Sequence, residues 1–296
     1  MAENNAKTLR LLMPEWQGGD YDLSVGSGEL YPLGARLLAF LAPQSGEETV
    51  EVPVSPYVPG AKRTKANGVV NQEIVLAQML AARKILEEKK PARVVTFGGE
   101  CLVSQAPFDY LNGLYKGNLG VIWIDAHPDV STPENHDREH AMVLGNLLGG
   151  GDPAFSSQVL HPLKPAQVLL VGMRGFDSPK EKETIGKFGL PVIPPEDAGA
   201  QPVLAWLEAA KFGNVAIHLD LDSLDPARFF SQLTNDPDAK EKYPTVKGHL
   251  DFPRVTGLIR AVSQAANVVG LTIAEYMPWD AMHLKRMMAQ LPIMTA

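Results

Sequence analysis

Acidic residues interrupt two of the most apolar stretches of the chain at a spacing that could bind metal ions. The stretch WIDAHPDVS contains Asp125, His127 and Asp129, and the stretch HLDLDSLDP contains Asp220 and Asp222. Alternate residues of an extended strand point to the same face, so each set converges if strand geometry persists that far. Both sets follow apolar segments, which places them at C-terminal strand ends, where open α/β sheets bind ligands.

Four carboxylates in one place require neutralisation, because like charges raise each other's pKa until a group protonates or a cation binds. Buried charges are normally paired or bound to a metal. An oxygen-rich ligand set with one imidazole suits Mn²⁺, and four aspartates with one histidine are enough for two ions. We therefore predict a two-metal site that activates water. A capping or turn role is the alternative for the second set, and Asp225-Pro226 is interpreted as a turn.

The only cysteine of the chain, Cys101, follows two glycines in the segment TFGGECLVSQ. It could be a nucleophile, a metal ligand or a small buried apolar residue. Nothing nearby would lower the pKa of its thiol, and Glu100 would raise it, so nucleophilic catalysis is the weakest hypothesis. A thiolate is a soft ligand that matches Mn²⁺ poorly, so we expect the thiol to be neutral.

The composition excludes several classes of protein. The chain has 296 residues, 45% of them hydrophobic, and a net charge of -7. It contains no lysine- and arginine-rich run typical of nucleic-acid binding, and no apolar run of the ~20 residues that a membrane helix needs. A single cysteine makes no internal disulfide, and the polar N-terminus lacks a signal core. We therefore expect a cytoplasmic protein that binds a small molecule, not nucleic acid or a membrane.

Short apolar runs alternate with amphipathic stretches along the chain. Strands are expected at residues 8–14, 51–56, 92–99, 119–127, 166–174, 191–195, 215–225 and 268–276, and helices at 31–42, 71–90, 178–189, 201–213, 252–266 and 279–294. Strands that are almost continuously apolar and alternate with helices indicate a parallel sheet covered on both faces. We predict one α/β domain over residues 1–296, with a mostly parallel sheet of about eight strands.

Three further features bear on the acidic site. The polar segments 131–142 and 229–253 contain prolines and lack periodicity, so we expect loops that carry function. His218 precedes Asp220 by two residues and is expected on the same strand face. It could support a metal ligand, act as a base that contacts the substrate, or be a core histidine with satisfied hydrogen bonds, and we favour the first.

Six motifs of the chain resemble those of the ureohydrolase (arginase-like) family. They are GGEC, DAHPD, EHAMV, GMRGFD, HLDLDSLDP and GLTIAEY, in family order between about residues 90 and 280, and the two aspartate-rich motifs are the specific ones. The resemblance implies a three-layer α/β/α fold and a homo-oligomer. It also implies two Mn²⁺ ions per subunit and hydrolysis of a guanidino or formimino carbon by a hydroxide that bridges them.

The resemblance also implies roles for the metal-binding residues. Asp125 and Asp220 match ligands that bridge the two metals. His127 and Asp222 match ligands of one metal. Asp129 matches a ligand of the other metal and a candidate for passing a proton to the leaving amine. Cys101 stands where the family usually has a histidine ligand, so we include it as a sixth candidate metal ligand.

Further roles implied by the resemblance concern the substrate. His140 matches a histidine that shuttles a proton, and His136 competes for that role. Glu275 matches the carboxylate that faces the guanidinium, and a planar cation would pair with it through two hydrogen bonds. Asp177 matches a residue on the amine side of the substrate, and Ser131 is a third candidate substrate contact.

Several departures from the family pattern argue against assigning arginine as the substrate. The exchange of histidine for Cys101 is the first. The loop that leads to His140 is about two residues shorter than in arginases and carries Glu134, Asp137 and Arg138. The Thr-Gly-Thr-Pro segment that usually follows the second aspartate motif is absent. The cysteine, with VIPPEDA and AIHLDLD, resembles the family branch that hydrolyses hydroxyarginine in D-cycloserine biosynthesis.

These observations predict a metal-dependent hydrolase of a guanidino or amidino compound, with an arginine-like or hydroxyarginine-like substrate and a urea-like product. The alternative is a metal-poor or metal-free homologue that binds an amino acid or a guanidinium without turnover, which the exchange at Cys101 favours. A two-metal phosphoesterase is a further alternative. The lack of an arginine and lysine cluster near the aspartate motifs counts against it.

Overall fold

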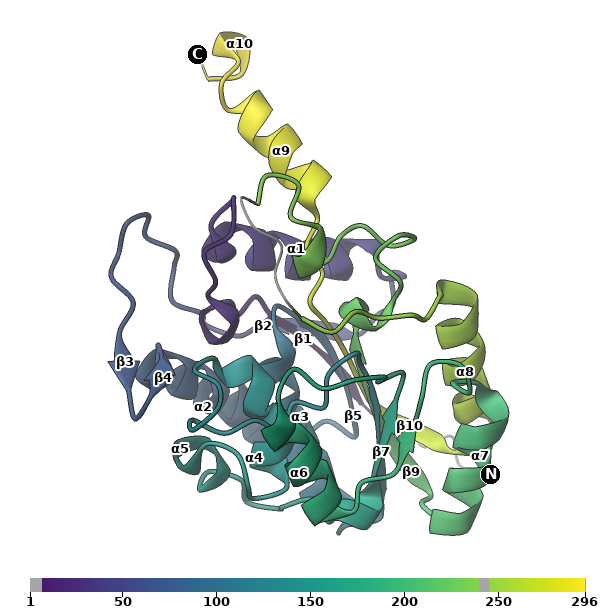
Figure 1. Cartoon of the computed structure of the whole chain (residues 1–296). Helices are drawn as coiled ribbons and strands as arrows, with labels where there is room; N and C mark the ends of the chain where they lie inside the picture. Colours follow the sequence, from purple (N-terminus) through teal and green to yellow (C-terminus); the bar gives the residue numbers. More distant parts are fainter. Residues whose placement is uncertain (1–6, 240–244, 296) are drawn as a thin grey trace.

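A parallel sheet of eight strands forms the centre of the computed structural model, which describes residues 7–239 and 245–295 (Figure 1). The strands are β1 Thr8–Met13, β2 Glu48–Glu51, β5 Arg93–Gly98, β6 Leu119–Ile124, β7 Val168–Val171, β8 Val192–Ile193, β9 Asn214–Asp220 and β10 Asn267–Ala274. They lie in the order β2-β1-β5-β10-β9-β6-β7-β8, and all neighbours run parallel. Their C-terminal ends therefore share one edge. A separate antiparallel pair consists of β3 Lys65–Ala66 and β4 Val69–Val70.

Helices cover both faces of the sheet. The helices of the described residues are α1 Ser27–Leu41, α2 Gln72–Lys89, α3 Gln105–Leu114, α4 Val143–Leu147, α5 Pro153–Ser156, α6 Pro179–Phe188, α7 Ala200–Ala210, α8 Phe252–Ala265, α9 Trp279–Met288 and α10 Pro292–Thr295. On one face, α2, α3 and α4 share an apolar core with Val121 and Trp123 of β6. On the other, α7 and α8 pack against Ile122 and Ile124. Successive residues of β6 thus enter different layers, and the predicted three-layer α/β/α fold is confirmed.

Most predicted elements are present, and the differences have local causes. The strand predicted at residues 51–56 lies earlier in the chain, since β2 covers Glu48–Glu51 and one further hydrogen bond to β1 follows it, from the N–H of Val52 to the carbonyl oxygen of Leu12. The helix predicted at 279–294 is interrupted before Pro292. Helix α3 is absent from the predicted elements. Its first turn contains Pro107, which is tolerated there because the first N–H groups of a helix have no partner within it. That residues 1–296 form one domain stays a prediction.

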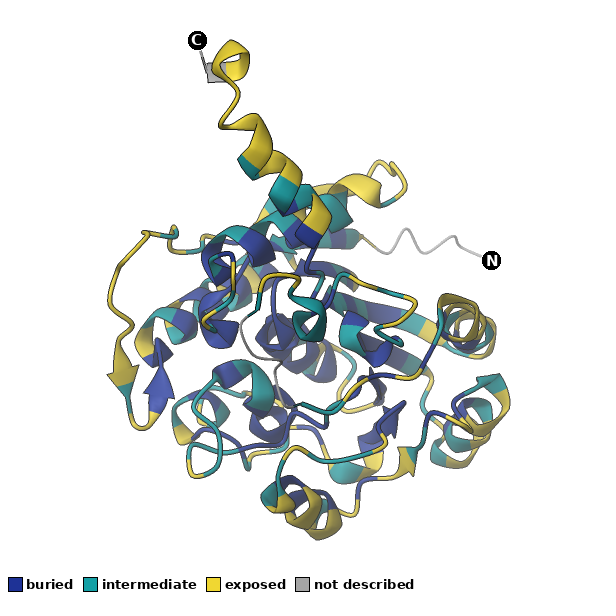
Figure 2. Ribbon diagram, turned by 45° about the horizontal axis from the view of Figure 1, so that its top comes forward, coloured by how far each residue is buried: buried dark blue, intermediate teal, exposed yellow. Residues whose placement is uncertain are grey.

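The C-terminal helices extend away from the sheet (Figure 1), and most of α9 and α10 is exposed, in contrast to the buried strands (Figure 2). Trp279 anchors the start of α9, because its buried indole donates a hydrogen bond to the carbonyl oxygen of Gln232 at 2.8 Å. In the part of the chain that the structure describes, no helix has the length and apolar character needed to cross a membrane.

Candidate active site

The two acidic motifs meet where β6 and β9 end side by side. The last residue of β6 is paired with the residue before Asp220, so Asp125 and Asp220 lie at the same level of the sheet edge. Strand geometry does not persist beyond this level. Asp129 has a left-handed backbone with a φ of 48°, and Asp222 lies in the 3-10 turn Leu221–Ser223. The carboxylates therefore converge through turns, and the prediction that they converge by alternation along strands is wrong for these two.

One set of converging ligand atoms, the His127 group, belongs to Asp125, His127 and Asp222 and lies within 4.8 Å. Nδ1 of His127 lies 3.0 Å from Oδ2 of Asp222 and 3.4 Å from Oδ1 of Asp125. Nε2 lies 2.8 Å from Oγ1 of Thr245, whose hydroxyl donates to Asp177 at 2.8 Å. That hydroxyl therefore accepts the Nε2 hydrogen, and Nδ1 faces two carboxylates. A cation between them would satisfy all three groups.

A second set, the Cys101 group, belongs to Cys101, Asp125, Asp129 and His218, again within 4.8 Å. All four side chains are buried. The thiol donates to Oδ2 of Asp220 at 2.9 Å, which brings the second acidic motif to the edge of this group. Since Asp125 belongs to both sets, the residues form two adjacent positions with one carboxylate between them.

Burial determines the charge of this cluster. Burial, and then repulsion from Asp222, raises the pKa of Asp125 to about 7. Burial and neighbouring carboxylates also raise the pKa of Asp129 and of Asp220 well above the usual value. Burial acts to raise the pKa of Asp222 as well, but the adjacent His127 outweighs it and the pKa falls. Without a cation, the cluster therefore holds protons that carboxyl groups normally release.

Three buried atoms of this described cluster have no hydrogen-bond partner: Oδ2 of Asp129, Oδ1 of Asp222 and Nε2 of His218. Unpartnered buried polar atoms are rare in folded proteins, so each calls for a ligand. Carboxylate oxygens and imidazole nitrogens are donors that divalent transition-metal ions accept. The residues present therefore fit a pair of divalent cations that share Asp125.

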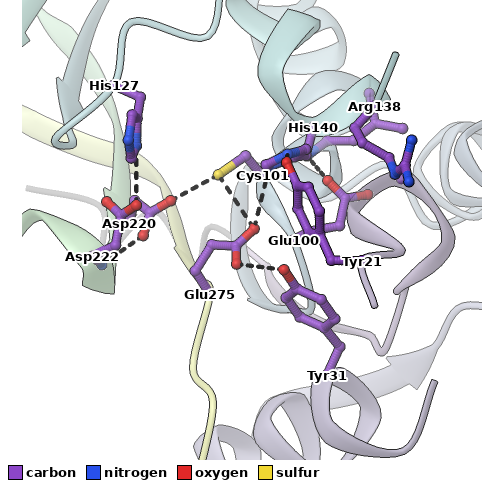
Figure 3. A network of polar contacts seen from close by, with 12 residues as sticks. Tyr21, Tyr31, Glu100, Cys101, His127, Arg138, His140, Asp220, Asp222 and Glu275 are labelled. Carbon is purple, nitrogen blue, oxygen red and sulfur yellow. Dashed lines mark hydrogen bonds and ion pairs between the residues drawn. The ribbon is translucent and has the colours of Figure 1, made fainter. Parts of the chain in front are cut away.

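The cluster forms one wall of a cavity of about 290 Å³. Glu275 follows β10 directly, has a left-handed φ of 61°, and lines the cavity beside the cluster, with Oε1 4.0 Å from Sγ of Cys101. Tyr31 of α1 donates a hydrogen bond to Oε2 of Glu275 at 2.8 Å (Figure 3). Gly34 lets α1 approach this closely, because a Cβ there would lie 1.8 Å from the carbonyl oxygen of Tyr276. A wider surface hollow of about 740 Å³, lined partly by Lys180 and Lys187, lacks such a cluster.

Two histidines line the same cavity beside Glu275. Nε2 of His140 lies 2.7 Å from the hydroxyl of Tyr21, and Nδ1 lies 3.6 Å from Oε1 of Glu275 (Figure 3). Nδ1 of His136 accepts the backbone N–H of Arg138 at 3.0 Å. Burial lowers the pKa of His140 to about 3 and that of His136 to about 4. Both rings are therefore neutral, and the ring of His140 is the nearer to Glu275.

The other two predicted substrate contacts lie differently. Asp177 lines the cavity, but its two oxygens accept hydrogen bonds from Thr245 and from the backbone N–H of Val246, both at 2.8 Å. Ser131 is fully buried and donates to Glu181 at 3.0 Å. It is not part of the cavity lining, whereas Glu181 is. Ten residues were predicted to bind metal, contact the substrate or take part in catalysis. Nine of them lie together at this edge of the sheet, and Ser131 lies behind the cavity wall.

Sequence reasoning did not find Tyr21, Tyr31 or Thr245 among the residues that touch the site. Each reaches it from a segment remote from the acidic motifs, and no local spacing or residue type distinguishes it. His218 did carry a signal, because its distance of two residues from Asp220 places both on one strand face.

Comparisons with known proteins agree with this geometry. The sequence model of the Arginase family matches residues 50–232, which is more than half of the chain. An N(omega)-hydroxy-L-arginine amidinohydrolase of Streptomyces lavendulae is 42% identical over 116 residues, or 38% of this chain and 40% of that protein. An arginase of Plasmodium berghei is 28% identical over 228 residues, or 72% of this chain and 61% of that protein. Each of these alignments spans less than two thirds of the relative.

Solved structures give the same result for the fold. The arginase of Entamoeba histolytica, solved with L-ornithine, aligns with a TM-score of 0.73 and 20% identity over 92% of this chain and 91% of that chain. The arginase of Bacillus caldovelox aligns with a TM-score of 0.71 and 22% identity over the same shares. Since the family model covers more than half of the sequence and the acidic motifs converge as described, this chain belongs to the arginase family.

Proposed function

We propose that this protein is a metal-dependent hydrolase that cleaves a C–N bond of a guanidino or amidino compound and releases urea, or a urea-like product, and an amine. One observation carries the proposal. Two groups of metal-ligand atoms share Asp125, and Glu275 lines the same cavity beside the Cys101 group. A cation site and a carboxylate in one cavity can bind a planar cationic substrate together.

The residues that would hold the cations are those of the two groups, together with Asp220. Two divalent cations bound there would supply Lewis-acid activation of water at neutral pH. Mn²⁺ is the ion we propose, because carboxylates dominate the ligands and hard oxygen ligands suit it. The position that contains Cys101 is the one we expect to hold Mn²⁺ more weakly.

Glu275 would bind and orient the substrate. Its carboxylate can accept two parallel hydrogen bonds from a guanidinium, which fixes the plane of the group. Tyr31 already donates to Oε2 and so holds the carboxylate in one orientation. The cavity of about 290 Å³ lies at the lower end of the sizes typical of small-molecule sites, so we propose a substrate about as large as an amino acid.

Proton transfer to the leaving amine would involve Asp129 or His140. Asp129 belongs to the ligand cluster and lines the cavity, so a carboxylate oxygen that binds no cation could carry a proton to the amine. The neutral ring of His140 can accept one, and its hydrogen bond with Tyr21 fixes the orientation of the ring. A base and an acid within reach of the same substrate typically accelerate a reaction by about 10²–10⁴-fold.

The similarity to the Streptomyces lavendulae enzyme supports a hydroxyarginine-like substrate over arginine itself. Asp177, expected on the amine side that arginine and hydroxyarginine share, already accepts hydrogen bonds from Thr245 and Val246. An amine of the substrate would have to share those oxygens or bind elsewhere in the cavity. Cytoplasmic location and homo-oligomeric assembly stay predictions.

A urea-release screen tests the proposal. Mn-loaded protein is incubated with arginine, hydroxyarginine, agmatine, guanidinobutyrate and formiminoglutamate, with hydroxyurea measured for hydroxyarginine and formamide for formiminoglutamate. We expect one of these to react, hydroxyarginine first. Glu275→Gln, which keeps the size of the side chain, should lose at least ~100-fold in kcat/KM. Silence on all five compounds at full metal occupancy would contradict the proposal, and guanidinium binding without turnover would favour the non-catalytic alternative.

A further inference from the structure

We propose that Nε2 of His218 is the nitrogen ligand of the cation position that contains Cys101. The inference rests on the proposed metal-dependent function and deepens it. Family resemblance leads one to expect a histidine at position 101, where this chain has a thiol. The structure assigns the missing nitrogen to a different strand, two residues before Asp220.

The position of His218 is fixed by the sheet. It lies in β9, pairs with Trp123 of β6 and shares the strand face of Asp220. The side chain is fully buried, and Nε2 has no hydrogen-bond partner. Its nearest charged neighbour is Oδ2 of Asp125 at 3.7 Å, which is too long for a hydrogen bond. A buried nitrogen aimed at a carboxylate cluster without touching it leaves room for a cation between them.

The other side of the ring explains its orientation. Nδ1 lies 2.8 Å from Oγ of Ser104, and the ring stacks on Trp123 with centroids 3.7 Å apart. A hydrogen on Nδ1, accepted by that hydroxyl, leaves the lone pair on Nε2 for the cluster. His127 is held in the same manner, with one nitrogen 2.8 Å from the hydroxyl of Thr245 and the other toward Asp125. The two histidines thus approach the shared carboxylate from its two sides.

Distances support ligation. Nε2 of His218 belongs to the group with Cys101, Asp125 and Asp129, whose atoms all lie within 4.8 Å of one another. Ligands about 2.1–2.3 Å from one metal can be at most about 4.6 Å apart, so little movement closes the site. The thiol of Cys101 is already engaged with Asp220 at 2.9 Å, which leaves the imidazole as the neutral donor.

A packing role is the competing explanation, and a matched pair of variants separates the two. His218→Asn places an amide where Nδ1 lies and so keeps a partner for Ser104, but it removes the atom at Nε2. His218→Gln reaches toward the Nε2 position. We expect His218→Asn to fold and to bind one Mn²⁺ as the wild type does, while the second binds at least ~100-fold more weakly in calorimetric titration. His218→Gln should recover part of this loss, and Cys101→His added to His218→Asn should recover more.

Pulsed electron paramagnetic resonance on protein with ¹⁵N-labelled histidine counts the histidine nitrogens bound directly to the metal. With Mn²⁺ at both positions, the wild type should show two such nitrogens, and His218→Asn should lose one of them. A single bound nitrogen in the wild type with two ions bound, or an unchanged count in His218→Asn, would overturn this inference and leave the proposed function intact. Unchanged binding of both ions by folded His218→Asn would overturn it as well. If no Mn²⁺ binds to the wild type at any concentration tested, the proposed function and this inference both fail.

Discussion

The His127 group and the Cys101 group share Asp125 but differ in access and in charge. In the first, the side chains of His127 and Asp222 are 19% and 20% exposed toward the cavity. In the second, Cys101 is 2% exposed and His218 is fully buried. The first group already contains an ion pair of opposite charges, since the pKa of His127 is raised and that of Asp222 is lowered. The second is surrounded by groups whose pKa is raised, Cys101 and Asp129 among them.

This difference predicts the order in which the two positions bind cations. A metal ligand has to be deprotonated, so binding a cation releases whatever protons the ligands hold. A cation that enters the His127 group meets the ionised carboxylate of Asp222 near the cavity and has to displace the proton of His127. A cation that enters the Cys101 group has to displace protons from buried carboxyl groups. We therefore expect ordered filling, with the His127 group first and with the steeper pH dependence at the second position.

The largest effect is expected at the carboxylate that the two groups share. Asp125→Asn keeps the size of the side chain but removes the charge between the two positions, so both should lose their cation. Asp222→Asn is the matched control, because it touches the His127 group alone and should leave about one ion per chain. Metal analysis after dialysis against micromolar Mn²⁺ checks this. Equal metal content in the two variants would contradict the sharing of Asp125.

The next effect concerns pH. As pH rises, the stability of the metal-free protein should fall, whereas metal binding should strengthen. The pKa of Asp125 is raised from 3.8 to about 7, so the folded metal-free state holds a proton that the unfolded chain releases. The stability that this proton supports is present below about pH 4 and is lost as pH rises through about 7. Metal binding, in contrast, strengthens as pH rises, because fewer protons have to leave.

Thermal unfolding between pH 5.5 and 8 checks this prediction. We expect the Tm of metal-free protein to fall with rising pH and the increase in Tm on adding Mn²⁺ to grow. Asp125→Asn should reduce the first trend, since Asp129 and Asp220 still hold protons, and should abolish the second, since both positions lose their cation. A Mn²⁺-induced increase in Tm that stays constant over this range would show that no buried proton is exchanged for metal.

The comparison also shows what the sequence could predict. The fold follows from apolar runs and their alternation with helices, and the strand ends follow from where carboxyl groups interrupt those runs at Asp125 and Asp220. The sequence could not show that Asp129 and Glu275 reach the cavity through left-handed backbone, because a turn of that kind depends on the surrounding packing. The site thus depends on tertiary packing more than the sheet does.

Residues that support the site from outside the motifs are the hardest to predict. Nothing in the sequence of α1 distinguishes Tyr31 as a residue of the site. It reaches Glu275 because Gly34 lets α1 pack closely against the backbone of Tyr276. Thr245 comes from a segment without periodicity, and its contact with His127 depends on tertiary packing. Ser131 shows the opposite case, since it was a candidate substrate contact, but its hydroxyl is buried against Glu181.

A smaller effect is expected from the two hydroxyl groups that form hydrogen bonds with His127 and His218. Thr245→Val removes the acceptor of the Nε2 hydrogen of His127, and Ser104→Ala removes the partner of Nδ1 of His218. Loss of such a partner typically weakens metal binding by about 10–100-fold, so each variant should weaken one position and spare the other. Calorimetric titration with Mn²⁺ resolves the two steps. If Ser104→Ala weakens the same step as Thr245→Val, the two histidines do not serve separate positions.

The smallest effect is expected from a variant that changes substrate binding but not metal binding. Tyr31→Phe removes the hydroxyl that donates to Glu275 while keeping the ring that packs α1 against the site. A hydrogen bond to a charged group contributes about 1.5 kcal/mol or more, so KM should rise roughly tenfold while both metal affinities stay unchanged. Burial raises the pKa of Glu275 to about 8, and the hydrogen bond from Tyr31 opposes that rise. The variant should therefore move the pH at which KM improves to a higher value, because guanidinium binding needs the ionised carboxylate. An unchanged pH profile of KM with the same tenfold loss would mean that Tyr31 acts only by positioning α1 and not through Glu275.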